Sequence, residues 1–291
     1  MFFGSIPALV TPFSGGRVAE DTFRALVEWQ IAGGSSGLVP CGTTGESATL
    51  NFDEHHRVIA MCVEQAKKRV PVIAGCGSNN TDSAIANMRE AKSNGADAAL
   101  IVLPYYNRPS QAGLIAHFRA LTEACDLPTI VYNVPGRTVT NISVETLAEV
   151  ARLSGIVGIK DATGDLGRVT AQRLACGEGF CQLSGNDETA LAFNAMGGVG
   201  CISVTANVAP ELCAQFQAAT REGRSQDALA LQDRLYPLHA ALFSDASPGP
   251  AKYALSKVRP GFPTELRLPL TEPSDASKQA VDEALEHAGL I

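Results

Sequence analysis

A repeated alternation between two hydrophobic patterns is the feature that most constrains the fold of this chain. Short apolar runs bounded by Gly, Pro or Asn recur up to about residue 205, and longer segments with helical periodicity separate them. The runs are apolar at successive positions, which is typical of parallel strands covered on both faces. We therefore expect strands at residues 6–11, 37–40, 72–74, 98–102, 129–133, 156–160, 181–184 and 201–204.

The segments between these runs predict connecting helices at residues 22–32, 53–68, 82–94, 114–124, 144–151, 166–174 and 188–195. Asn51 and Glu54 form a capping-box pattern before the second helix, and Asn94 with Gly95 suits the end of the third. About eight strand–helix units indicate an α/β protein with a closed (β/α)8 TIM barrel. An open doubly wound sheet would normally carry a glycine-rich dinucleotide fingerprint after its first strand, and residues 11–16 carry none.

The strand pattern stops near residue 210, and only helical patterns follow, at residues 211–221, 226–243, 251–257 and 277–287. No low-complexity linker separates the two parts. We therefore expect a catalytic barrel at residues 1–209 and a helical C-terminal extension at residues 210–291 that packs on the barrel.

The composition narrows the class of protein. With 23 Lys and Arg against 30 Asp and Glu, the chain is net acidic, which argues against nucleic acid as a partner. The start of the chain has no basic segment before an apolar run, so we expect no secretion signal and no membrane anchor. The uncharged segment 189–210 is interrupted by Gly and Asn and predicts a buried helix, a turn and a strand. The eight cysteines include no C-x-x-C pair, which favours buried thiols in a reducing cytoplasm, with neither zinc nor disulfides.

In a barrel of this kind, the active site lies at the C-terminal ends of the strands. Lys160 closes the apolar run 155–159, where an ammonium group would have to leave water. Burial favours the neutral amine, which is the form that attacks a carbonyl carbon. One interpretation is a Schiff-base nucleophile, and the other is a lysine paired with a carboxylate at the barrel rim.

Other polar residues end neighbouring strands. Tyr132 could transfer protons beside Lys160 or could be a rim aromatic bonded to the backbone. The turn 42–45 offers hydroxyl and N–H groups suited to a small carboxylate. Arg137 follows a rigid Pro-Gly turn and could bind a substrate carboxylate or form a surface salt bridge.

Tyr105 and Tyr106 lie between Pro104 and Pro109, and packing or an interface is their simplest interpretation. His55 and His56 lie on a predicted helix without metal-ligand spacing, so we expect them to face solvent or an interface.

The segments 42–46 (GTTGE), 132–138 (YNVPGRT) and 158–164 (GIKDATG) together resemble the dihydrodipicolinate synthase family. The resemblance extends to 104–109 (PYYNRP) and 202–207 (ISVTAN), in the family's order and spacing over nearly the whole chain. It implies a Schiff-base lyase that condenses pyruvate with L-aspartate 4-semialdehyde, the first committed step toward diaminopimelate and lysine. It also implies no cofactor and a homotetramer built as a dimer of tight dimers.

The resemblance also assigns roles residue by residue. Lys160 matches the imine-forming lysine, and Thr43, Tyr132 and Tyr106 match a proton relay to which the neighbouring subunit contributes Tyr106. The substrate-binding positions match Arg137 for the semialdehyde carboxylate, Thr43 and Thr44 near the pyruvate carboxylate, and the backbones of Gly185 and Ile202 lining the site.

Two alternatives remain at this stage. N-acetylneuraminate lyases and 2-keto-3-deoxy-sugar-acid aldolases share the lysine and the tyrosine but act on long polyols. Thr43-Thr44, where neuraminate lyases usually have Ser-Thr, and Arg137 favour the synthase. A catalytically silent keto-acid-binding barrel would be marked by loss of Lys160 or Tyr132, and both are present.

Feedback-sensitive members bind lysine at the dimer interface through residues that match a set in this chain: Ser47, Ala48, His55, Asn79 and Tyr105. They usually also have a histidine where this chain has Phe52 and a glutamate where it has Ser83. Loss of a carboxylate that would pair with the lysine ammonium removes a charge-assisted hydrogen bond. The sequence therefore predicts weak or absent inhibition by lysine.

Overall fold

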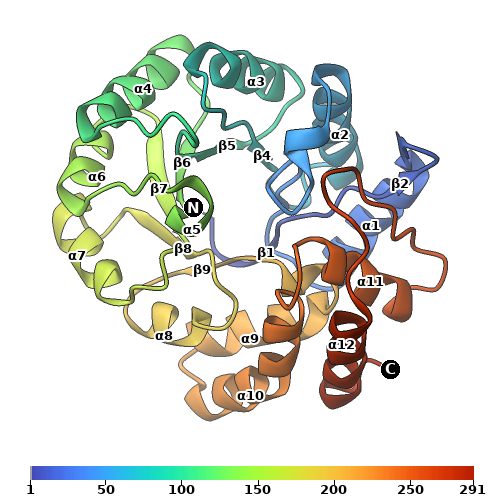
Figure 1. Ribbon diagram of the computed structural model, residues 1–291. Coiled ribbons are helices and arrows are strands. Elements are labelled where there is room, and N and C mark those ends of the chain that lie inside the picture. Colours follow the sequence, from blue (N-terminus) through green and yellow to red (C-terminus); the bar gives the residue numbers. More distant parts are fainter. Residues whose placement is uncertain (1) are drawn as a thin grey trace.

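In residues 2–291, which the computed structural model of the protein describes, seven parallel strands form a curved sheet (Figure 1). Their order is β1 (Gly4–Pro7), β9 (Gly200–Ser203), β8 (Cys181–Ser184), β7 (Ile156–Asp161), β6 (Thr129–Asn133), β5 (Ala98–Val102) and β4 (Ile73–Gly75). Residues 38 and 39 close the ring, because Val39 bridges Ala8 and Leu38 bridges Val72. The predicted (β/α)8 barrel is confirmed.

Each helix predicted before residue 210 is present, with its ends moved by a few residues. These helices are α1 (Glu20–Ala32), α2 (Phe52–Ala66), α3 (Thr81–Ser93), α4 (Gln111–Ala124), α6 (Val144–Val150), α7 (Gly167–Cys176) and α8 (Ala190–Ala195). The capping box is confirmed, since the Asn51 side chain accepts from the Glu54 backbone and Glu54 accepts in return. Asn94 and Gly95 end α3, with Gly95 in a left-handed conformation at φ +86°.

Several local predictions were incomplete. The first strand begins and ends earlier than predicted, and of residues 37–40 only Leu38 and Val39 pair, each through a single bridge. Pro40 has no N–H to donate, and Cys41 turns the chain away with a left-handed φ of 56°. Residues 11–16, which carry no dinucleotide fingerprint, lead into a small hairpin of β2 (Phe13–Ser14) and β3 (Arg17–Val18) that was not predicted. Three single-turn helices were also not predicted: η1 (Ser47–Thr49), α5 (Pro135–Thr138) and η2 (Thr205–Asn207).

Two hydrophobic layers hold the barrel together. Alternate strand residues form a buried inner cluster that includes Ile6, Val39, Ile73, Leu100, Ile130, Leu183 and Ile202. The residues between them, such as Val131 and Ile159, join the larger core beneath the helices. This alternation explains the continuous apolar runs in the sequence, and it places Tyr132 with the inner cluster.

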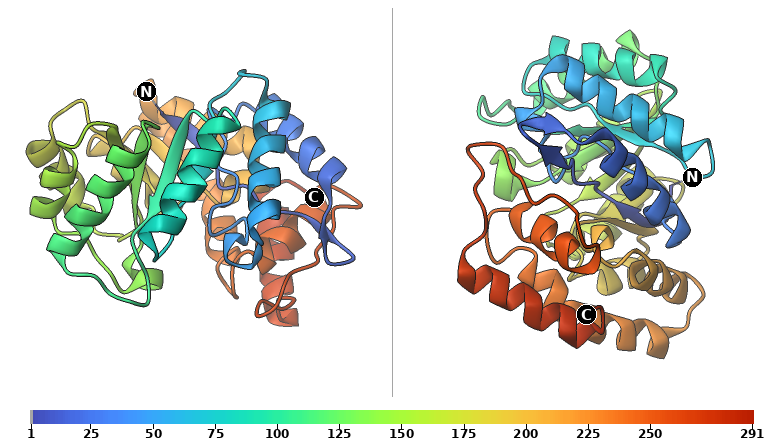
Figure 2. Two further views of the ribbon diagram at one scale, coloured as in Figure 1. Left: turned by 90° about the horizontal axis from the view of Figure 1, so that it is seen from above. Right: turned by 90° about the vertical axis from the view of Figure 1, so that its right-hand side faces the viewer.

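The chain after β9 forms α9 (Pro210–Arg221), α10 (Ser225–Ala241), α11 (Gly249–Val258) and α12 (Asp275–Ala288). Helix α9 contacts β1 and α8, while α10 and α11 both contact α12. Figure 2 shows these helices gathered on one side of the barrel. Helix α9 follows the last strand and itself packs on the barrel. The division of the chain into two domains at residue 210 remains a prediction.

The helix, turn and strand predicted for residues 189–210 are confirmed by α8 and β9. No helix in residues 2–291 combines the length and apolar character needed to cross a membrane. All eight cysteines are free thiols, and all except the partly exposed Cys176 are buried. Within the same residues, His, Cys, Asp and Glu form no cluster of three or more that could hold a metal ion.

Candidate active site

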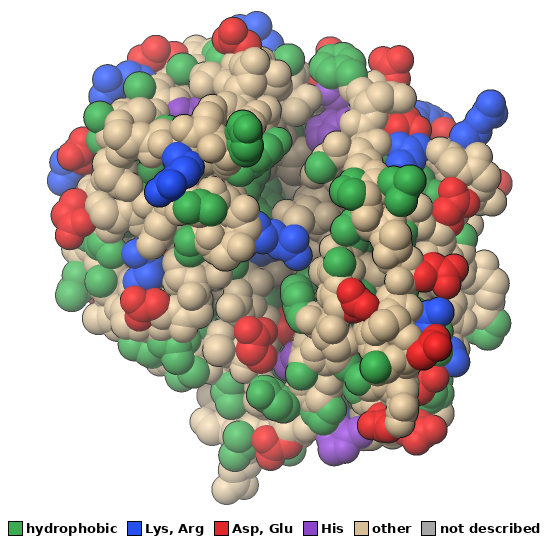
Figure 3. Space-filling view, viewed as in Figure 1, with side chains coloured by type: hydrophobic (Ala, Val, Ile, Leu, Met, Phe, Trp, Pro, Cys, Tyr) green, Lys and Arg blue, Asp and Glu red, His purple; other side chains and the backbone are tan. Residues whose placement is uncertain are grey.

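A cavity of about 420 Å³ opens among the C-terminal ends of the strands. The face seen in Figure 3 is hollowed near its centre, with basic side chains beside the hollow. Strand ends, the loops that follow them and α10 all contribute to the wall, which consists of Thr43, Thr44, Tyr132, Val134, Arg137, Lys160, Ala162, Gly185, Asn186, Glu188, Val204, Tyr236, His239, Ala240, Phe243 and Ser247. The cavity therefore contains six of the residues expected at the site: Thr43, Thr44, Tyr132, Arg137, Lys160 and Gly185.

Lys160 and Tyr132 lie side by side at the centre of this site. Parallel pairing of β6 with β7 puts them in register, and both are buried, at 6% and 7% exposed. The Lys160 Nζ lies 4.2 Å from the centroid of the Tyr132 ring. An amine and a phenol therefore share one small cavity at the barrel mouth, as the sequence predicted.

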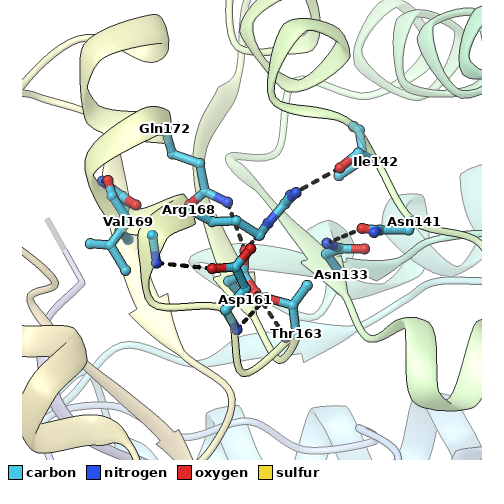
Figure 4. Close-up of polar contacts among 11 residues, drawn as sticks. Asn133, Asn141, Ile142, Asp161, Thr163, Arg168, Val169 and Gln172 are labelled. Carbon is cyan, nitrogen blue, oxygen red and sulfur yellow. Dashed lines mark hydrogen bonds and ion pairs between the residues drawn. The ribbon is translucent and has the colours of Figure 1, made fainter.

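The carboxylate of Asp161, the residue that follows Lys160, forms its hydrogen bonds with other residues and not with Lys160 (Figure 4). Asp161 accepts hydrogen bonds from the Thr163 backbone and hydroxyl, from Arg168 Nε at 3.1 Å and from Gln172 Nε2 at 2.6 Å. Arg168 also donates to the Ile142 carbonyl. Successive side chains on a strand point to opposite faces, which is why Asp161 and Lys160 diverge. Lys160 forms no ion pair within residues 2–291, so its interpretation as half of a rim ion pair finds no support.

The turn 42–46 carries Thr43 and Thr44 to the cavity wall. The amides of Gly45 and Glu46 donate to the carbonyls of Gly42 and Thr43, and the Thr11 hydroxyl donates to the Gly45 carbonyl at 2.7 Å. Thr44 is buried and Thr43 is exposed, and both line the cavity. The structure thus presents hydroxyl groups beside the buried lysine.

Gly185 has a steric reason for being glycine. A Cβ there would lie 2.6 Å from the Ala162 Cβ and 3.1 Å from the Lys160 Cε. Any side chain would therefore collide with Ala162 and crowd the end of the lysine side chain. Ile202 differs, because its side chain is fully buried in the inner cluster and Val204 lines the cavity instead. Only the backbone of Ile202 is left for the role expected of it.

Arg137 lies on α5, one turn after β6, and its exposed side chain lines the cavity. Among the described residues it has no carboxylate partner, so the salt-bridge interpretation finds no support. The guanidinium is therefore free to bind an anionic group at the cavity mouth.

Tyr106 does not join the cavity within one chain. It is 91% exposed and holds a left-handed φ of 72° in the loop between Pro104 and Pro109. The next residue, Asn107, donates from Nδ2 to the Asn79 carbonyl at 2.8 Å, which fixes the loop. The structure thus separates Tyr106 from Tyr132 and Thr43.

The expectation that His55 and His56 face solvent or an interface was wrong about solvent. Both are buried, because they lie on the face of α2 that packs inward. His55 Nε2 donates to the Gly75 carbonyl at 2.8 Å, and burial lowers the pKa of His55 to about 4. Among the other residues matched to a lysine site, Ser47 and Asn79 are half-buried, while Ala48 and Tyr105 are exposed.

The sequence motifs did not predict one wall of the cavity. Tyr236, His239 and Phe243 come from α10 or the residues just after it, more than 70 positions beyond Lys160. His239 Nδ1 lies 2.8 Å from the Thr205 hydroxyl, and burial lowers the pKa of His239. No local spacing in the sequence connects these residues with the strand ends.

A buried lysine that faces the centre of a barrel, beside a tyrosine and below a free arginine, defines an enzyme of the class I aldolase type, a lyase that forms a Schiff base. The chain belongs to the dihydrodipicolinate synthetase family, whose model matches residues 1–288. It is 67% identical over 290 residues to the 4-hydroxy-tetrahydrodipicolinate synthase of Rhizorhabdus wittichii and 66% identical over 291 residues to that of Zymomonas mobilis, with full coverage of each chain.

Solved structures agree with this assignment. The 4-hydroxy-tetrahydrodipicolinate synthase of Methylacidiphilum fumariolicum superposes with a TM-score of 0.97 at 36% identity, covering 99% of this chain and 96% of that one. The chloride-inhibited dihydrodipicolinate synthase of Acinetobacter baumannii, solved in complex with pyruvate, gives a TM-score of 0.97 at 43% identity and covers both chains fully.

Proposed function

We propose that this chain condenses pyruvate with L-aspartate 4-semialdehyde through a Schiff base on Lys160, as a 4-hydroxy-tetrahydrodipicolinate synthase. The reaction is the first committed step of lysine biosynthesis by the diaminopimelate route. The observation that carries the proposal is the pairing of buried Lys160 with Tyr132 in the cavity, in a chain so similar to named synthases over its full length.

The chemistry follows from the amine. The Lys160 nitrogen attacks the pyruvate C2 carbonyl, and loss of water leaves an imine. The imine withdraws electrons, so the methyl group loses a proton and becomes an enamine. The enamine carbon attacks the aldehyde carbon, and the new alkoxide takes up a proton. The amino group of the semialdehyde then attacks the imine carbon, which closes the ring and releases Lys160.

Proton transfer is assigned to the relay of Tyr132, Thr43 and Tyr106. Tyr132 lies against the Lys160 side chain, and Thr43 lines the same cavity. Because Tyr106 is outside the cavity of its own chain, we infer that a second copy supplies it across a tight dimer. Exposed Phe52, Tyr105 and Val139 give the chain further apolar surface suited to an interface.

We also propose a homotetramer of two tight dimers, which sedimentation analysis at several protein concentrations can test. The location proposed for the enzyme is the cytoplasm, which the buried free thiols support.

The binding groups fit two small acids. Thr43 and Thr44 are assigned to the pyruvate carboxylate, together with the backbone of Gly185, which lines the cavity, and the backbone of Ile202. Arg137 at the mouth is assigned to the carboxylate of the semialdehyde.

Replacing Arg137 with alanine is expected to raise the KM for the semialdehyde about 10- to 100-fold, the worth of a charge-assisted hydrogen bond. The half-saturating pyruvate concentration should change by less than about twofold. Steady-state kinetics with each substrate varied in turn measures both. Arg119→Ala, at an exposed position of α4, is the control. An equal rise for both substrates would count against the assignment.

We expect lysine to inhibit weakly or not at all. Phe52 is 55% exposed and packs its ring 3.8 Å from that of His56, so a hydrophobic group stands where sensitive members usually have a histidine. Ser83 offers no carboxylate to the lysine ammonium. Initial rates with lysine titrated from micromolar to millimolar concentrations test this expectation, and strong inhibition below about 1 mM, a free energy of roughly −4 kcal/mol, would refute it.

An assay that couples product formation to a downstream reductase, with pyruvate and L-aspartate 4-semialdehyde, tests the proposed function. Turnover should require both substrates. If a sugar-derived aldehyde supports pyruvate consumption and the semialdehyde does not, the chain is a sugar-acid aldolase. If neither aldehyde supports turnover while pyruvate binds, the barrel is catalytically silent.

A further inference from the structure

Two charged side chains that the proposed reaction does not use are completely buried against each other. Glu46 and Lys252 both have side chains that are 0% exposed, and they form an ion pair across 206 positions of sequence. Glu46 ends the turn 42–46, while Lys252 lies on α11. The pair therefore connects the turn 42–46 with helix α11.

The surroundings of the pair fix both partners. The Glu46 carboxylate also accepts from the Arg267 amide at 3.1 Å, and Lys252 Nζ donates to the Glu265 carbonyl at 2.8 Å. The Lys252 and Arg267 cations both lie over the Phe13 ring, at 4.4 Å and 4.3 Å from its centroid. Burial lowers the pKa of Lys252, and the negative charge of Glu46 opposes that shift.

The backbone of Glu46 links the ion pair to the residues of the cavity wall. Glu46 has a left-handed φ of 54°, which a non-glycine residue adopts only where its surroundings hold it. Its amide donates to the Thr43 carbonyl at 3.0 Å. A side chain anchored to α11 thus fixes the turn that carries Thr43 and Thr44 beside Lys160.

Stability alone does not explain such a pair. A buried ion pair is often no more stabilising than apolar residues of the same volume, because both charges must leave water. We propose that Glu46 and Lys252 are positioning residues that hold the turn 42–46 so that Thr43 and Thr44 meet the pyruvate carboxylate. This inference rests on the proposed function of the same cavity.

The double variant Glu46→Gln with Lys252→Met tests the proposal. It removes both charges with little change in volume. Each single variant would leave the other residue as an unpaired buried charge, and the double variant avoids this. The adduct of pyruvate with the protein is trapped with borohydride at a series of pyruvate concentrations. We expect the concentration that gives half-maximal adduct to rise about tenfold, because small displacements of binding groups greatly weaken productive substrate binding. The KM for the semialdehyde should change by less than about twofold.

Lys257→Met is the matched control. Lys257 is on the same helix but pairs with Asp282 at the surface, away from the turn, so its half-saturation should equal that of the unsubstituted protein. Half-saturation does not depend on the amount of active protein, so partial unfolding of the double variant does not obscure the result.

Unchanged pyruvate half-saturation in the double variant overturns the positioning role. A parallel rise for both substrates also overturns it, because it indicates general loosening. If the unsubstituted protein forms no adduct with pyruvate, both the proposed function and this inference fail.

Discussion

Replacing Lys160 with alanine is expected to abolish the reducible adduct with pyruvate and to lower turnover by about 10⁴-fold or more, as loss of the nucleophile does in other covalent enzymes. Lys160 is the buried lysine of the cavity, and no carboxylate pairs with it in residues 2–291. Intact-mass measurement after borohydride treatment shows the adduct directly. The same measurement on the alanine variant should show unmodified protein.

Lys257→Met is a suitable control here too, because it removes a surface lysine and should leave the adduct unchanged. An adduct that persists at full yield in the Lys160→Ala protein would place the nucleophile elsewhere.

Replacing Tyr132 with phenylalanine is expected to lower kcat by roughly 10²- to 10³-fold, the usual contribution of a positioned proton-transfer group. The ring remains to pack at 4.2 Å from the lysine nitrogen, so the fold and the position of Lys160 should be preserved. The adduct should therefore still form, although more slowly. Single-turnover trapping with pyruvate alone separates imine formation from the complete reaction.

Tyr253→Phe provides the comparison, because the Tyr253 hydroxyl donates to Asp282 between α11 and α12, and Tyr253 does not line the cavity. Its turnover should stay within about twofold of the unsubstituted rate. A Tyr132→Phe protein with turnover as high as this control would remove Tyr132 from the relay.

The barrel and the centre of its site were predictable because they depend on local patterns. Strands covered on both faces have continuous apolar runs, and residues that end neighbouring parallel strands meet at one rim. Lys160 and Tyr132 follow that rule, and the structure places them in register. The hairpin of β2 and β3 did not follow, because strands of two residues are too short to show a period.

The burial of His55 and His56 could have been recognised. His55 lies three and four residues before Val58 and Ile59 on the same helix, so it continues the apolar face that packs inward. Its polar ring suggested solvent, but the Gly75 carbonyl satisfies one ring nitrogen in the interior.

Other contacts had no local signal. His239 comes from α10 and Phe243 from the residues just after it, and the pattern of that helix says nothing about the barrel mouth. Glu46 and Lys252 are 206 positions apart, and neither residue alone predicts the other. Such contacts depend on how α10 and α11 pack against the barrel, which the strand and helix patterns of the sequence do not encode.

The wall that α10 contributes has a consequence for how the enzyme can change. Lys160 and Tyr132 stand on strands of the barrel, whereas Tyr236 and His239 shape the space in front of them from a separate helix. Substitutions on α10 can alter the space in front of Lys160, the proposed imine-forming residue, and Tyr132 without changing the strands that carry them. In the proposed reaction, selection for a different aldehyde and selection for imine formation would therefore act on different parts of the sequence.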